Sequence, residues 1–232
     1  MSTAIILAGG RGTRAEQTRP KQFVEVCGAP VIIHTLRVFE AHPDISRIIV
    51  VGMEEWLDYI ERECRTHGIS KVQRIVSAGA TSHDSLMNGI VMASQGLNID
   101  DDECIVVHES VRPFVTSEMI SDGLATCRER GNAITAVTGN EALLQSEDGV
   151  ASSQSFARET MYMAQMPQFF KLGELIEAFR EAQERCIKAQ SLNQLMVQLG
   201  HLPLYISRGS LSNIKLTNPE DMEMLEYRLR KR

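Results

Sequence analysis

The fold is decided by the stretch Ile5-Ile6-Leu7-Ala8-Gly9-Gly10-Arg11-Gly12-Thr13-Arg14, which is followed closely by Pro20-Lys21-Gln22. A short apolar strand runs into a glycine turn, and such a turn offers bare backbone N–H groups to an anion. From Arg11 to Lys21 the chain has four basic residues and one acidic residue, whereas the formal charge of the whole chain is −6. An acidic chain that concentrates cations in one loop is predicted to bind a small phosphorylated ligand there, and neither a nucleic acid nor a membrane surface.

Length and cysteine content predict one soluble domain. A chain of 232 residues can bury a large core, and no stretch has the composition of a linker, so we expect residues 1–232 to form a single domain. No apolar run approaches the roughly 18 residues that a membrane-spanning helix needs. The cysteines are odd in number and lack a CxxC pair: Cys27, Cys64, Cys104, Cys127 and Cys186. Reduced thiols of this kind are typical of a cytoplasmic protein.

Strand-like and helix-like patterns alternate along the first 137 residues. After the opening strand, β-branched or apolar runs predict strands over 47–52, 72–76, 104–108 and 133–137. Apolar residues at helical spacing predict helices over 31–39, 54–67, 82–95 and 118–130. Repeated strand–helix units favour an α/β fold of the Rossmann-like, three-layer α/β/α type with a mostly parallel sheet.

The pattern changes in the second half of the chain. Residues 138–165 are polar and lack sustained helical periodicity, so we expect a projecting β-arm that engages a partner subunit in a homodimer. Further helices are predicted over 172–189 and 192–199, and a last strand over 202–206. Asn218 is a suitable cap for a final helix that begins at Pro219.

Polar residues follow several of the predicted strands. Glu109 and Arg112 come directly after the strand over 104–108, and Lys215 lies near the end of the chain. Ligands of open α/β sheets bind beyond the carboxyl ends of the strands, so these side chains are expected in one cleft with the glycine loop. Together they would supply an anion cradle, further cations and one carboxylate for a divalent metal, which is a set suited to phosphoryl or nucleotidyl transfer. His108 ends an apolar strand and is interpreted as a buried structural histidine.

The glycine loop by itself fits several proteins, including an ordinary strand–helix turn. It is not a Walker A motif, because the GK[ST] ending is absent. A pyridine-nucleotide dehydrogenase is disfavoured for two reasons: Ala15 stands near the place of the third glycine, and Gly52 and Met53 end the second strand where an acidic residue would hold the ribose.

Four stretches follow one pattern in collinear order along nearly the whole chain. They are Leu7 to Arg14 with Arg19-Pro20-Lys21-Gln22-Phe23, Val107-His108-Glu109-Ser110-Val111-Arg112-Pro113-Phe114, Pro167-Gln168-Phe169-Phe170, and Asn213-Ile214-Lys215-Leu216-Thr217-Asn218-Pro219-Glu220-Asp221. This pattern resembles the sugar-nucleotide-type nucleotidyltransferases, and specifically the cytidylyltransferases that act on polyol phosphates. The resemblance implies a fold of the nucleotide-diphospho-sugar transferase type. Ribitol-5-phosphate enzymes are the more similar group, and 2-C-methyl-D-erythritol 4-phosphate enzymes come next.

The resemblance implies a reaction and a set of roles. An oxygen of the acceptor phosphate would attack the α-phosphorus of CTP, and pyrophosphate would leave. Three cations would be catalytic: Arg14, Lys21 and Lys215. Contacts to the nucleotide would come from Leu7, Ala8, Gly9, Gly10, Gly12, Thr13, Gly79, Asp84 and Ser85. Arg112 and Arg158 would bind the acceptor, and Glu109 would hold Mg²⁺ with help from triphosphate oxygens and water.

The chain departs from the family pattern mainly on the metal and acceptor sides. The family usually has Asp at the position of Glu109 and a second Asp at the position of Ser212. It has Arg where this chain has Ser82, and Thr where it has Met166. Residues 190–193 (Gln-Ser-Leu-Asn) align with Thr-Asp-Glu-Ala. These departures leave three hypotheses open: a different or less highly charged acceptor, weaker metal binding, or a nucleotide-binding protein that has lost turnover.

Overall fold

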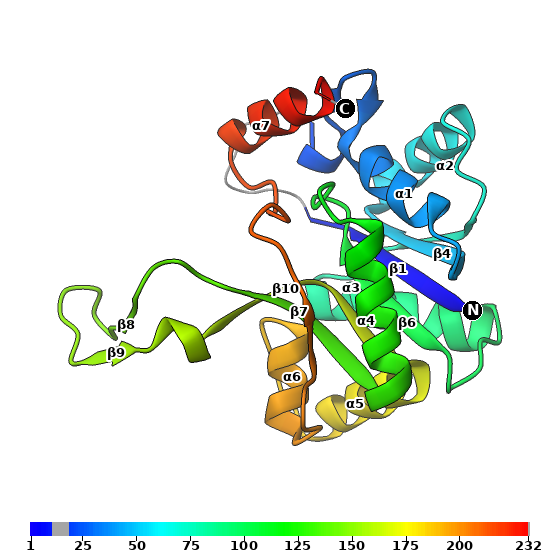
Figure 1. The fold of residues 1–232 in the computed structure, drawn as a ribbon. Helices are drawn as coiled ribbons and strands as arrows, with labels where there is room; N and C mark the ends of the chain where they lie inside the picture. The colour runs from blue at the N-terminus through cyan, green and yellow to red at the C-terminus, as the bar shows by residue number, and fades with distance from the viewer. Residues whose placement is uncertain (11–18, 232) are drawn as a thin grey trace.

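The computed structural model describes residues 1–10 and 19–231, and a seven-stranded sheet forms its centre (Figure 1). The strand order is β11-β7-β10-β6-β1-β4-β5. The bounds of these strands are β1 Ser2–Ala8, β4 Ile45–Gly52, β5 Val72–Ser77, β6 Cys104–Glu109, β7 Asn132–Thr138, β10 Tyr162–Lys171 and β11 Ile206–Arg208. All neighbouring strands pair in parallel except β10, which is antiparallel to both β6 and β7. The predicted α/β fold with a mostly parallel sheet is therefore confirmed.

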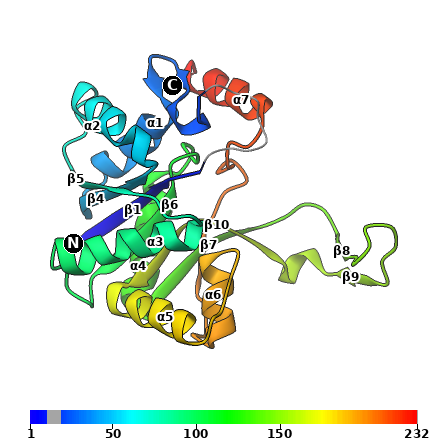
Figure 2. The same cartoon turned by 180° about the vertical axis from the view of Figure 1, so that it is seen from behind.

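Helices cover both faces of this sheet. One face packs against α1 Val31–Ala41, α2 Leu57–Thr66 and α4 Ser117–Arg130. The other face packs against α3 Ser82–Val91, α5 Leu172–Glu184 and α6 Leu192–Leu199, which Figure 2 shows from behind. Strand β1 shows why two cores form: Ile6 belongs to the first and Ile5 to the second, because successive side chains of a strand point to opposite faces.

Shorter elements complete the described chain. They are the one-turn helices η1 Lys21–Phe23, η2 Glu54–Trp56 and η4 Arg158–Thr160, the π-helical turn η3 Met92–Gly96, the strand pair β2 Glu25–Val26 and β3 Ala29–Pro30, and the C-terminal helix α7 Pro219–Leu229. Asn218 and Asp221 form a reciprocal capping box at the start of α7, as expected for the cap. None of the helices in the described ranges has both the length and the apolar character needed to cross a bilayer.

The arm follows β7 and leads into β10. Two short strands, β8 Leu143–Gln145 and β9 Gln154–Phe156, pair only with each other, and every residue of both is exposed. Figure 1 shows this hairpin extending away from the sheet. This hairpin lies within the range 138–165 expected for the arm, and residues 162–165 of that range already belong to β10.

Three predicted boundaries were wrong. Strand β10 continues to Lys171, in a stretch where no strand was expected, and the helix expected over 172–189 ends at Glu184. The last strand lies at Ile206–Arg208 and not at 202–206. The side chain of Asn132 donates to the carbonyl of Pro203 and accepts from the N–H of Tyr205, and so takes the place of a regular strand ladder there.

Candidate active site

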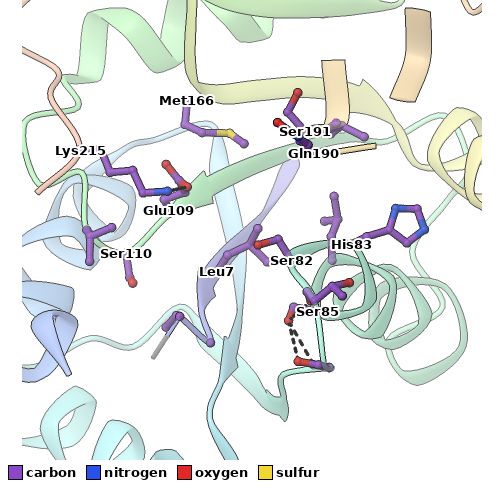
Figure 3. Close-up of a pocket in the computed structure, with 18 of the residues that line it drawn as sticks. Leu7, Ser82, His83, Ser85, Glu109, Ser110, Met166, Gln190, Ser191 and Lys215 are labelled. Carbon is purple, nitrogen blue, oxygen red and sulfur yellow. Dashed lines mark hydrogen bonds and ion pairs between the residues drawn. The ribbon is translucent and has the colours of Figure 1, made fainter. Parts of the chain in front are cut away.

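A cavity of about 920 Å³ opens at the carboxyl ends of the parallel strands (Figure 3). A volume of this size is typical of small-molecule sites. The predicted site residues that line it are Leu7, Ala8, Gly9, Gly10, Lys21, Gly79, Ser85, Glu109 and Lys215. Most of the predicted site is therefore brought together. Gly12, Thr13 and Arg14 lie outside the described residues.

Glycine is required where β1 ends. A Cβ atom on Gly9 would lie 2.4 Å from the Cβ of Ala78, so a larger residue would push two loops apart. The side-chain amide of Gln22 donates to the carbonyls of Ala8 (2.7 Å) and Gly10 (3.0 Å). Gln22 thus fixes the backbone at the mouth of the cavity. The sequence motif includes Gln22, but its role could not be predicted from the sequence.

A second turn enters the cavity before α3. The N–H of Gly79 donates to Oγ of Ser85 (3.1 Å), and that hydroxyl also contacts the carbonyl of Thr81 (2.8 Å). Asp84 is not among the lining residues. Its carboxylate accepts a bond from the N–H of Thr81 (3.0 Å), and its own N–H donates to Oγ1 of Thr81 (3.1 Å); these reciprocal bonds form the capping box of α3. The structure therefore gives Asp84 the role of a helix cap, and its expected contact with the nucleotide stays a prediction.

Glu109 is held between two cations at the end of β6. Its Oε2 lies 2.6 Å from Nε of Arg112, and its Oε1 lies 2.5 Å from Nζ of Lys215 (Figure 3). Burial by itself would raise the pKa of the Glu109 carboxyl, but the charges of Lys215 and Arg112 outweigh it and hold that pKa below its ordinary value. Arg112 also donates to the carbonyl of Asn213 (3.1 Å) and does not line the cavity. In this arrangement it orients Glu109 and the segment that carries Lys215.

His108 supports this cluster from inside the core. It is fully buried, and its Nε2 lies 3.1 Å from the carbonyl of Arg112, to which it donates. Its ring packs against Phe39 with centroids 5.1 Å apart. Burial lowers the pKa of His108 to about 4, so the ring is neutral at physiological pH. The interpretation of His108 as a structural residue agrees with this geometry.

The two described lysines of the site come from distant parts of the chain. Lys21 begins η1, and its ammonium donates to the carbonyl of Thr217. Lys215 lies in an irregular segment whose neighbours are fixed: Asn213 is fully buried and donates to the carbonyl of Met166 (2.6 Å), and Leu216 is buried as well. Both ammonium groups therefore face one cavity on separately anchored backbones.

Besides Glu109, five positions that depart from the family pattern line the cavity: Ser82, Met166, Gln190, Ser191 and Leu192. We call them the variable lining. Figure 3 shows Ser82, Gln190 and Ser191 on the opposite side of the cavity from Glu109 and Lys215. Beside them His83 lines the cavity while its ring stacks on Phe179, with centroids 4.3 Å apart. Nothing in the sequence pattern had indicated His83, because its only signal is its position beside Asp84.

The structure places Arg158 away from the cavity and shows no preformed metal site among the described residues. Arg158 lies on the arm, pairs with Glu159 (3.1 Å) and does not reach the cavity of its own chain. Within residues 1–10 and 19–231, no three His, Cys, Asp or Glu side chains gather as a preformed metal site. Glu109 is the one acidic side chain among the described lining residues.

Comparison with known proteins gives one consistent family. The sequence matches the family described as 2-C-methyl-D-erythritol 4-phosphate cytidylyltransferase (IspD) over residues 2–231. A ribitol-5-phosphate cytidylyltransferase from Lacticaseibacillus paracasei is 35% identical, over 100% of this chain and 99% of its own. A 2-C-methyl-D-erythritol 4-phosphate cytidylyltransferase from Geobacter metallireducens is 34% identical, over 96% of this chain and 95% of its own.

A solved structure of similar fold supports the assignment. The 4-diphosphocytidyl-2C-methyl-D-erythritol synthase of Anaerococcus prevotii superposes with a TM-score of 0.83 at 22% identity, covering 98% of this chain and 97% of its own. At this identity the likeness concerns the fold alone, and it agrees with the sheet and layers described above. The full-length matches, with Gly9, Gly10, the two lysines and the carboxylate gathered at the sheet's carboxyl end, show that the chain belongs to the 2-C-methyl-D-erythritol 4-phosphate cytidylyltransferase (IspD) family.

Proposed function

We propose that this protein transfers CMP from CTP to a pentitol-type phosphate resembling ribitol 5-phosphate, with release of pyrophosphate and formation of a CDP-alditol. The observation that carries the choice of acceptor is the variable lining. The residues expected on the nucleotide side keep the family pattern, whereas the five departures of the variable lining, from three separate places in the sequence, line the same cavity. The full-length identity to a ribitol-5-phosphate cytidylyltransferase supports this proposal.

The chemistry needs cations more than a base. An acceptor phosphate is already ionised at neutral pH, so its oxygen can attack without general-base help. The transition state then gathers charge around the α-phosphorus and the departing pyrophosphate. Lys21 and Lys215 face the cavity from two anchored segments and would stabilise that charge. We assign the same role to Arg14 on the family pattern.

Mg²⁺ is part of the proposal. The site offers one carboxylate, Glu109, at the cavity, and Mg²⁺ commonly binds through one or two carboxylates together with substrate phosphates. The residues therefore fit such an ion, provided that the triphosphate supplies the other ligands and Lys215 moves from Oε1 of Glu109 to a phosphate oxygen. Bound there, Mg²⁺ would neutralise triphosphate charge.

The arm is proposed to join two copies of the chain. The arm exposes apolar side chains, namely Leu144, Val150 and Phe156. Arg158 does not line the cavity of its own chain. In a homodimer the arm of one copy would cover the other, and Arg158 would meet an acceptor phosphate there. All five cysteines are free thiols, which supports a reducing, cytoplasmic location.

A panel of acceptors tests the proposal. Purified protein is incubated with CTP, Mg²⁺ and, separately, ribitol 5-phosphate, 2-C-methyl-D-erythritol 4-phosphate and glycerol 3-phosphate, and pyrophosphate release is measured. We expect the highest kcat/KM with ribitol 5-phosphate. A preference for the methylerythritol phosphate would favour the second candidate activity, which the 34% identity to the Geobacter enzyme supports.

A third candidate is a nucleotide-binding protein without turnover. Serine at position 212, where the family carries a second carboxylate, is the observation that favours it. Calorimetry distinguishes it from an enzyme: tight CTP binding without pyrophosphate release for any acceptor would support this candidate and contradict the transferase.

A further inference from the structure

Three aromatic rings pack together next to Lys21 but outside the cavity. Phe23 is fully buried and stacks on Trp56 with centroids 4.4 Å apart and ring planes 14° apart. Tyr59 lies edge-on to both rings, at 5.4 Å from Phe23 and 5.3 Å from Trp56. None of the three lines the cavity. Trp56 ends η2 and Tyr59 lies in the first turn of α2, so one helical segment carries two of the rings.

The same rings hold Arg19. Its guanidinium carbon lies 4.7 Å from the centroid of Tyr59 and 5.6 Å from that of Trp56. Nε of Arg19 is buried and has no hydrogen-bond partner among the described residues, and the carboxylate of Glu25 stands 4.0 Å from its NH1. Contact with the aromatic faces is thus the main interaction that the described structure gives this side chain.

Lys21 lies midway between the two residues that the rings hold. Arg19 precedes it by two positions and Phe23 follows it by two. The N–H of Phe23 donates to the carbonyl of Pro20 (2.9 Å), which closes the turn around Lys21. The backbone of Lys21 is therefore fixed on both sides by Trp56 and Tyr59, and its ammonium is directed toward the cavity.

We propose that Trp56 and Tyr59 are positioning residues for Lys21, acting through Phe23 and Arg19 without touching a substrate. This inference rests on the proposed function, in which Lys21 stabilises the transition state. Misplacing a catalytic group by about 1 Å can cost roughly 10²-fold in rate. Loss of the ring contact should therefore lower kcat more than it weakens CTP binding.

The first test compares three single variants. Trp56→Ala should lower kcat by at least about tenfold while KM for CTP changes by less than about threefold, because the lost stabilisation is confined to the transition state. Trp56→Phe keeps an aromatic face and should recover most of the rate. Tyr205→Ala is the matched control, because Arg130 lies over Tyr205 at the same 5.6 Å but neither residue lines the cavity, and it should behave as the unchanged protein. Thermal melts show that each variant is folded.

The second test reads the position of Lys21 without any turnover, so it separates a failure of this inference from a failure of the proposed function. Folded protein is treated briefly with acetic anhydride, and acetylation of each lysine is measured by peptide mass spectrometry. Trp56→Ala should raise the acetylation of Lys21 relative to Lys215, and Tyr205→Ala should not. Equal acetylation of Lys21 in Trp56→Ala and unchanged protein would overturn the proposal, as would a Trp56→Phe protein as slow as Trp56→Ala.

Discussion

The two ends of strand β10 belong to regions that are held in different ways. Tyr162 and Met163, at the arm end, are 49% and 41% exposed, whereas Phe169 and Phe170, at the sheet end, are fully buried. The sheet end pairs with β6 and β7 on its two sides, and β6 carries Glu109. The difference shows that the candidate site is built on the buried end, where packing fixes the backbone to which Glu109 and Lys215 are attached.

The arm is held mainly by its own polar contacts. In its tip, Oδ1 of Asp148 accepts bonds from the N–H groups of Val150 (2.9 Å) and Ala151 (3.1 Å). These backbone bonds, with one from Ser146, lower the pKa of Asp148 to about 2. Local bonds of this kind shape a turn but bury no core. Changes in the sequence of the arm should therefore leave the stability of the sheet unchanged. This property suits a segment that is proposed to contact a second copy of the chain.

The largest expected effect lies at the buried end of β10. Phe169→Ala removes a ring that packs against Gly123 of α4, and it should lower the free energy of unfolding by about 3–5 kcal/mol. Urea unfolding at pH 7 measures this change. A loss below about 1 kcal/mol would show that α4 closes over the gap, and that the sheet end is less rigid than the burial indicates.

The next effect is on catalysis alone. Lys21→Ala should lower kcat by about 10²–10³-fold, the cost of removing one charge-stabilising group in a transition state, and leave the free energy of unfolding nearly unchanged. Turnover with CTP and ribitol 5-phosphate, beside urea unfolding, gives both numbers. The matched substitution is Lys188→Ala, an exposed lysine that does not line the cavity. If both variants lose the same activity, the assignment of Lys21 is wrong.

A pair of carboxamide variants compares the site with the arm directly. Glu109→Gln leaves Arg112 and Lys215 without their carboxylate, and it should cost about 1–3 kcal/mol of unfolding free energy. Glu159→Gln breaks an exposed pair with Arg158 on the arm and should cost less than about 0.5 kcal/mol. Similar losses for the two variants would contradict the view that the ion pairs of Glu109 stabilise the fold more than the exposed pair on the arm does.

The same variant predicts a pH dependence. The folded-state pKa of Glu109 lies below the ordinary value of 4.5, so the unfolded chain binds this proton more readily. The stabilisation from Glu109 is thus fully present above pH 4.5 and is lost as the pH falls through the folded-state value. Urea unfolding is measured from pH 7 to pH 3. The difference in unfolding free energy between the unchanged protein and Glu109→Gln should shrink toward pH 3. A difference that stays constant would show that it does not come from the ion pairs of Glu109.

The smallest effect is expected at the arm end of β10. Tyr162→Ala truncates an aromatic side chain in the same strand as Phe169, but the ring is half-exposed, so the unfolding free energy should change by less than about 0.5 kcal/mol. Urea unfolding at a protein concentration low enough to keep two copies apart gives the change in unfolding free energy of the isolated chain. A loss comparable to that of Phe169→Ala would mean that the arm folds as part of the core.

Much of the fold could be predicted because the signals are local. Apolar runs and helix caps such as Asn218 depend on neighbours in sequence, and they predicted the α-helices α1–α7 and five strands of the central sheet: β1, β4, β5, β6 and β7. Strand β10 was missed because its first half is exposed and its second half fully buried, so it has no single alternation pattern. Strand β11 was misplaced because the side chain of Asn132, some 70 residues away, decides which residues can pair.

The candidate site divides in the same manner. Gly9, Gly10, Lys21, Glu109 and Lys215 were predicted from residue type and order, and all five line the cavity. The capping role of Asp84, the backbone contacts of Gln22 and the place of His83 could not be predicted, since each depends on what stands opposite it in space. The proposed roles of Arg14 and Arg158 stay predictions.

The sequence by itself determined the order of strands and helices, the glycine turn with its cations, and the family to which the chain belongs. Only the tertiary structure decided that Lys215 meets a carboxylate 106 positions earlier in the chain, and that the ammonium of Lys21 meets a carbonyl 196 positions later. The reason is physical. A turn or a cap is stabilised by its immediate neighbours, whereas these contacts form only once the sheet has aligned the ends of its strands and closed the long loops between them.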